Sequence, residues 1–248
     1  MFQAPVSRLA TTAALAAALG AACAAVAGPL YRVRWIELEP AMVMVVSGAA
    51  AAVVALLLAV PGFLTTLGLH GKRGRGRALL ALLLGGAVVT VTAPHFYAAF
   101  TLPAIHDVST DLDNPPAFDA LAAARARGDN PLEHPGEKVA EKQRQAYPEI
   151  EARYYSHNVA DLLAAAQQVA WSQGWTVART DEQGGLEAAA RSDWFAFVDD
   201  VAVRIRDEGP GERRVDVRSA SRVGQHDLGA NARRIKAFFA ELEAVLDE

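Results

Sequence analysis

The chain has 248 residues, 52% of them hydrophobic and 21% charged, which excludes a disordered protein and allows two structural units. Residues 1–104 carry seven basic and two acidic residues, a net charge of +5, whereas residues 105–248 carry 17 basic and 26 acidic residues, a net charge of −9. An acidic C-terminal half disfavours nucleic-acid binding, which depends on neutralising phosphates.

Three long stretches without Asp, Glu, Lys or Arg dominate the N-terminal half. They are residues 9–31, 40–69 and 78–105. Each exceeds the roughly 20 residues that a helix needs to cross a hydrocarbon core of about 30 Å. The sequence therefore predicts a transmembrane block over residues 1–104, with helices at about 9–30, 42–66 and 78–100.

The loop at residues 70–77 predicts the orientation of this block. Its sequence is HGKRGRGR, and short basic loops of this kind stay in the cytoplasm. The third helix then runs outward and delivers residues 105–248 to the periplasm of a two-membrane bacterium. The sequence thus predicts a multi-pass protein of the bacterial inner membrane, with the lipid bilayer as a partner. The first helix is either retained or removed as a signal peptide after Ala27, where small residues form a cleavage pattern.

Residues 105–248 predict a soluble α+β domain. Its first part, residues 106–156, is rich in Pro, Asp and Asn and is typical of turns and extended chain. Within it we expect a short helix at 119–127 and a polar surface loop over 133–147.

Two helices and four strands are predicted in the rest of this domain. An amphipathic helix spans 158–172, with Asn158 as its N-cap, and a final helix spans 228–246, with Asp227 as its N-cap. The strands between them form two hairpins, at 175–179, 186–190, 195–207 and 213–222. The expected fold is an antiparallel sheet of about four strands flanked by two helices on one face.

The apolar residues of the second hairpin predict its register, because they must share one face. The pairs are Val201 with Ser219, Val203 with Val217, and Ile205 with Val215. The opposite face then carries Arg204 across from Asp216, with Asp200 diagonal to Arg218 and Arg222. We expect this charged face to point outward.

Three motifs resemble a known family, the domain of unknown function 1499. The longest is VRSASRVGQHDLGANARRI at residues 217–235, hereafter the signature; STDLDNPP at 109–116 and QAYPEI at 145–150 are also similar. The resemblance covers roughly residues 104–246. It implies a domain found in bacterial envelopes and plastids, sometimes behind membrane helices, with no established activity.

The signature holds the side chains of a site for an anion or another polar ligand. The candidates are Arg218, Ser219, Ser221, Arg222, Asp227 and Asn231, together with Asp200. Arginine supplies charge, serine supplies hydroxyl groups, and the start of the last helix would supply free N–H groups near residues 228–230. The alternative is structural, with the two arginines paired to Asp199, Asp200 and Asp216.

Three function classes follow from these residues. We favour a non-enzymatic, membrane-anchored binding or assembly module, whose partner is an envelope protein or a small polar ligand. The alternative is an envelope hydrolase or transferase that uses Asp199 and Asp200 with Arg218 and Arg222, and a weaker one is a lipid-handling domain. The sequence predicts no metal site, no cofactor and no nucleic-acid partner, and it identifies no catalytic residue.

Overall fold

The computed structural model describes residues 4–67 and 72–247. The chain divides into two compact units. The N-terminal unit holds the residues up to Tyr97 together with the short segment Trp194–Ala196. The C-terminal unit holds Ala98–Asp193 and the residues from Phe197 onward. Residues 70 and 71 of the basic loop lie outside the described residues.

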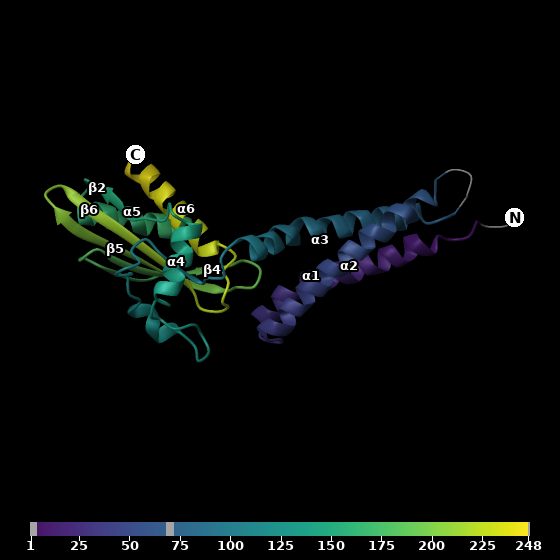
Figure 1. Ribbon diagram of the computed structural model, residues 1–248, viewed down its shortest axis with the longest axis horizontal. Helices are drawn as coiled ribbons and strands as arrows, with labels where there is room; N and C mark the ends of the chain where they lie inside the picture. The colour runs from purple at the N-terminus through teal and green to yellow at the C-terminus, as the bar shows by residue number, and fades with distance from the viewer. Residues whose placement is uncertain (1–3, 68–71, 248) are drawn as a thin grey trace. The chain divides into compact units, whose positions relative to one another are not determined.

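Three long helices form the N-terminal unit (Figure 1). They are α1 (Arg8–Arg32), α2 (Leu38–Leu64) and α3 (Arg75–Thr101). Each is long and apolar enough to cross a membrane, in agreement with the three predicted spans.

Small residues allow α1 and α2 to pack closely. A Cβ atom added to Gly20 would lie 2.7 Å from the carbonyl oxygen of Gly48, and one added to Gly48 would lie 2.7 Å from the carbonyl oxygen of Gly20. Alanines continue the contact on both sides, among them Ala17 and Ala55, which are fully buried. Close approach of backbones through small residues is a common way for helices to associate in lipid.

The C-terminal unit is built on an antiparallel sheet of six strands, two more than predicted. The strands are β1 (Asp107–Ser109), β2 (Arg153–Tyr155), β3 (Thr176–Asp181), β4 (Gly185–Arg191), β5 (Val198–Gly209) and β6 (Glu212–Ser221). Their order is β1-β6-β5-β4-β3, and β2 pairs with β6 beside β1. The predicted register of β5 and β6 is confirmed, since Val203 pairs with Val217 and Arg204 with Asp216.

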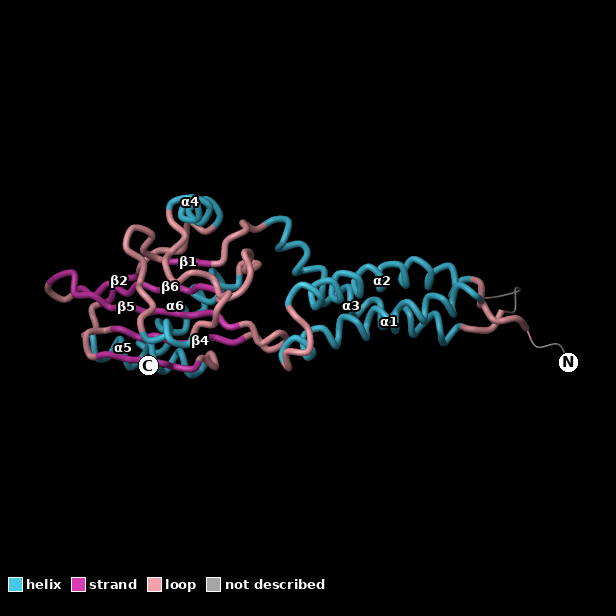
Figure 2. Tube along the Cα trace, turned by 90° about the horizontal axis from the view of Figure 1, so that it is seen from below, coloured by secondary structure: helices cyan, strands magenta, loops and turns pink. Residues whose placement is uncertain are grey.

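Helices α5 (Val159–Ser172) and α6 (Ala230–Leu246) lie together against one face of this sheet (Figures 1 and 2). Their apolar stripes and the strands form the main core, with Leu162, Val169, Phe238 and Leu242 among its helical members. The ring of Phe238 stacks on Trp175, with ring centroids 5.8 Å apart. The space between these helices and the strands is thus filled by packed side chains.

The second face of the sheet was expected to point outward, and this expectation is wrong. The segment that follows β1 lies across it and includes a short 3-10 helix, η2 (Ala120–Ala124). Phe118 and Leu121 from this segment pack on Ala202 and Ala220 of the sheet. We call this side of the sheet the covered face. Its acidic residues Glu187, Asp200 and Asp216 are therefore buried, and its arginines in β5 and β6 are buried or half-buried.

Helix α4 (Glu137–Ala146) replaces most of the loop that the sequence predicted over 133–147. Most of its residues are polar, and the two that are buried are Ala140 and Gln143. The buried amide of Gln143 donates to the carbonyl oxygen of Ser109 (2.7 Å) and accepts from the Ser109 N–H (3.0 Å). One side chain thus satisfies both backbone groups of a residue in the edge strand β1, and this contact holds α4 in place.

Candidate functional site

The residues of the predicted site lie on opposite faces of the sheet. Successive side chains of a strand point to opposite faces, so Arg218 and Ser219 in β6 diverge. Arg218 meets the segment on the covered face, whereas Ser219 meets Asn231 of α6. The signature therefore builds two separate polar networks, one on each side of the sheet.

Arg218 is enclosed in the covered face. Its side chain is 3% exposed and forms a two-pronged ion pair with Asp107, with N–O distances of 3.0 and 2.7 Å. It also donates to the carbonyl oxygens of Pro116 (3.1 Å) and Leu132 (2.7 Å), and its guanidinium lies 4.5 Å from the centre of the Phe118 ring. The register places Asp200 diagonal to Arg218 as predicted, but Arg218 forms its ion pair with Asp107 of β1 and not with Asp199, Asp200 or Asp216.

Arg222 does pair with Asp200, as the structural alternative predicted. Its Nε and Nη2 atoms donate to Asp200 Oδ1 at 2.9 and 2.7 Å. The other oxygen accepts from Nε of Arg125 at 2.8 Å, and Asp200 is fully buried. Arg222 also donates to the carbonyl oxygen of Ala124 (2.9 Å), so this arginine fixes the end of η2 to the sheet.

A third ion cluster lies further along the covered face. Asp216 is fully buried, and one of its oxygens accepts from Nη2 of both Arg204 (3.1 Å) and Arg206 (3.0 Å). The carboxylate of Asp111 accepts from the same two groups and from Arg214, at 3.0 to 3.1 Å. Asp111 belongs to the STDLDNPP motif, so these contacts join that motif to the second hairpin.

Acid should weaken this cluster. Burial acts to raise the pKa of Asp111, but the N–H group of Asn114 and the three guanidiniums outweigh it and lower that pKa below its ordinary value. A carboxyl whose pKa is lowered in the folded state stabilises the fold above its unfolded pKa, near 4, and this contribution is lost as the pH falls through the folded pKa. We therefore expect the thermal midpoint of the full chain to fall below about pH 4, and to fall less steeply in the Asp111→Asn variant.

The control for this titration is Asp113→Asn, two residues away, where the carboxylate is exposed. This variant should follow the acid dependence of the unmodified protein. Equal slopes for Asp111→Asn and the unmodified protein would show that the cluster does not couple to pH.

The second network lies between the sheet and α6. Ser219 donates to Oδ1 of Asn231 (2.7 Å), and the Asn231 amide nitrogen donates to Ser221 Oγ (3.0 Å) and to the carbonyl oxygen of His106 (3.1 Å). Arg234 donates to Ser219 Oγ (2.9 Å) and to Asp199 (2.6 Å). Ser219 and Asn231 are fully buried, so these side chains connect α6 to the sheet and are closed to solvent.

Asp227 serves the start of α6, although the helix begins at Ala230 and not at residue 228. Its two oxygens accept from the N–H groups of Gly229 (2.7 Å) and Asn231 (3.0 Å). The N–H of Leu228 is bonded to Nδ1 of His226. The N–H groups expected to be free near residues 228–230 are thus occupied. Burial raises the pKa of Asp227 even though these hydrogen bonds oppose the shift.

The two carboxylates of the hydrolase alternative do not converge. Asp199 and Asp200 are neighbours in β5 and therefore point to opposite faces, the first to Arg234 and the second to Arg125 and Arg222. Acid–base catalysis needs its groups within reach of one reacting atom. This pair leaves no such position.

Several partners in these networks escaped prediction. They are Asp107, Asp111, Arg125, Arg206, Arg214 and Arg234. Of these residues, only Arg234 lies inside the signature. Arg206 and Arg214 lie in the hairpin just before the signature, whereas Asp107, Asp111 and Arg125 come from a segment about 90 or more residues earlier, and no spacing within the signature points to them.

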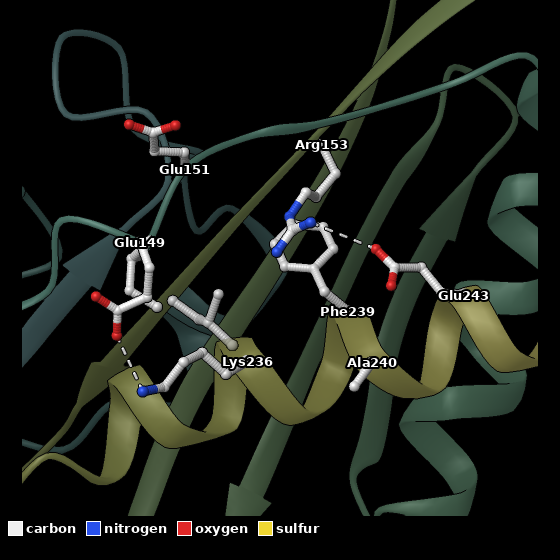
Figure 3. Close-up of a pocket in the computed structure, with 9 residues that line it drawn as sticks. Glu149, Glu151, Arg153, Lys236, Phe239, Ala240 and Glu243 are labelled. Carbon is white, nitrogen blue, oxygen red and sulfur yellow. Dashed lines mark hydrogen bonds and ion pairs between the residues drawn. The ribbon is translucent and has the colours of Figure 1, made fainter.

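A surface groove runs along α6, and we call it the α6 groove (Figure 3). It has a volume of about 180 Å³. Its lining residues are Glu149, Ile150 and Glu151 before β2, Arg153 at the start of β2, and Ile235, Lys236, Phe239, Ala240 and Glu243 of α6. Ion pairs stand at its two ends, Glu149 with Lys236 at 3.0 Å and Arg153 with Glu243 at 3.6 Å.

Between the two ion pairs, the α6 groove is lined by the apolar residues Ile235, Phe239 and Ala240, the first two of which are buried. The Arg153 guanidinium lies 5.7 Å from the centre of the Phe239 ring, and the side chain of Glu151 points away from α6 (Figure 3). Ala240 is exposed at this level of the helix. The groove can therefore receive an apolar side chain between two charged pairs.

The comparisons with known proteins bear on this unit. A family model described as "Protein of unknown function (DUF1499)" matches residues 107–242. The match begins at Asp107, the partner of Arg218, and ends in α6, so it contains both buried networks and most of the α6 groove. No curated protein matches the chain.

Proposed function

The chain belongs to the DUF1499 family, and we propose that it is a membrane-anchored module that acts by binding and not by catalysis. Its C-terminal unit works in the periplasm of a bacterium whose inner membrane holds α1, α2 and α3. Three apolar helices and the basic loop between the second and third support this placement.

The observation that carries the proposal is that the polar side chains of the signature already have hydrogen-bond and ion-pair partners within the chain. Arg218, Ser219 and Asn231 are almost entirely buried, as is Asp200, which pairs with Arg222 of the signature, and each is bonded to other groups of the chain. Charges buried in this way are suited to holding a fold in one arrangement. We infer that the signature shapes the module and that binding occurs elsewhere on its surface.

The α6 groove is the surface that suits a partner. Its volume of about 180 Å³ lies below the roughly 300 Å³ at which small-molecule pockets begin, so one side chain of a partner protein fits it better than a free ligand. Apolar anchors surrounded by polar groups are typical of protein interfaces. We propose that an envelope protein places one apolar side chain over Ala240, between the two ion pairs.

Site-specific photo-crosslinking in living cells tests this proposal, with the full chain in its native membrane. A photoreactive residue at Ala240 should give one discrete crosslinked product. The matched control is Ala237, which is also an exposed alanine of α6 but does not line the groove. No product at Ala240, or the same product at both positions, would refute a partner site in the groove.

A further inference from the structure

Five cationic side chains gather at one end of the N-terminal unit. They are Arg8, Lys72, Arg73, Arg75 and Arg77, all exposed, and we call them the basic end. Helix α1 begins at Arg8 and α3 begins at Arg75, while α2 ends nearby at Leu64. Cations from two separate segments of the chain therefore share one end of the helices.

Backbone hydrogen bonds fix these two segments to each other. The N–H of Ser7 donates to the carbonyl oxygen of Arg73 (2.8 Å), and the N–H of Arg73 donates to the carbonyl oxygen of Pro5 (3.0 Å). Arg77 donates to the hydroxyl of Thr11 (2.9 Å), and the Arg75 guanidinium lies 5.8 Å from the centre of the Phe63 ring. The cations are thus arranged before any ligand arrives.

Acidic residues of this unit lie far from the basic end. The sequence has no Asp or Glu in residues 1–36 or 40–106, and Glu37 and Glu39 stand where α2 begins. With 27 residues at 1.5 Å each, α2 separates them from the basic end by about 40 Å. The sequence of this unit therefore places no acidic residue next to the basic end.

Apolar side chains adjoin the cations directly. Leu9 follows Arg8, and Leu79 and Leu80 stand just beyond Arg77, and all three leucines are exposed. A group of cations beside exposed apolar side chains matches the boundary between lipid headgroups and acyl chains. We propose that the basic end binds the phosphate groups of anionic membrane lipids, and that it does so by preference over zwitterionic lipids.

This inference is independent of the partner proposed for the α6 groove. It can be tested on the full chain purified in detergent, by native mass spectrometry with added phosphatidylglycerol or phosphatidylcholine. The unmodified protein should bind phosphatidylglycerol more tightly. Each cation near a headgroup contributes about fivefold, so the Arg73→Gln/Arg75→Gln variant should lose about 25-fold of that affinity.

Two control variants separate a headgroup site from a general effect of charge. Arg32→Gln/Arg34→Gln removes two cations at the other end of α1 and should leave the preference unchanged. Arg73→Lys/Arg75→Lys keeps the charge and should keep most of the affinity. Circular dichroism checks that every variant retains its helices, and because the protein is in detergent, its orientation in a membrane does not affect the result.

Three results would overturn the inference. One is equal affinity of the unmodified protein for the two lipids. Another is an equal loss in Arg32→Gln/Arg34→Gln and Arg73→Gln/Arg75→Gln. The third is displacement of phosphatidylglycerol by inorganic phosphate at the same concentration as the lipid, which would assign the basic end to a free ion.

Discussion

Replacement of Arg218 by methionine is expected to lower the free energy of unfolding of the C-terminal unit by about 3–5 kcal/mol, because Asp107 then stays buried without a cation. For a domain of this size, that loss corresponds to a fall of roughly 6–20 °C in the unfolding midpoint. Thermal unfolding of the full chain in detergent, followed by tryptophan fluorescence, measures it, since Trp175 is buried in the core beside Phe238.

Two further variants show whether the unpaired buried charge of Asp107 causes the loss of stability in Arg218→Met. In Asp107→Leu/Arg218→Met both charges are absent, so the double variant should be more stable than Arg218→Met alone. Arg222→Met should cost less than Arg218→Met, because Arg125 still holds Asp200. If the effects at positions 107 and 218 simply add, the ion pair does not stabilise the unit in the proposed way.

Reporter fusions that test the orientation of the chain in the membrane should give an all-or-none result. A phosphatase reporter that works only outside the cytoplasm should be active when fused to the C-terminus and inactive when fused after Lys72. The physical reason is the retention of short Lys- and Arg-rich loops on the cytoplasmic side. The opposite pattern at the two fusion points would reverse the proposed topology.

The hairpin of β5 and β6 could be predicted because its information is local. Val201, Val203 and Ile205 in one strand and Val215 and Val217 in the other alternate with other residues, mostly charged, and this pattern determines both the register and the faces; Arg204 lies opposite Asp216. The same reasoning could not show whether the charged face is open. That depends on Phe118 and Leu121, which lie about 100 residues earlier in the chain.

The short strands could not be predicted for a different reason. Strands β1 and β2 have three residues each, which is too short for a periodic pattern to be visible. They exist because β6 offers an edge to pair with. The candidate site divides in a similar way: the register of the hairpin predicted the pair of Asp200 with Arg222, but Asp107, which pairs with Arg218, comes from a segment about 110 residues earlier.

The pairing of Asp107 with Arg218 also has a consequence for the order of folding during synthesis. The two residues are 111 positions apart. At roughly 5–20 residues per second, Asp107 is made about 6–22 s before its partner. During that interval β1 has no neighbouring strand, and the segment that will cover the sheet must remain soluble by itself. Its prolines, aspartates and asparagines at residues 109–131 suit that period, because they resist premature strand pairing.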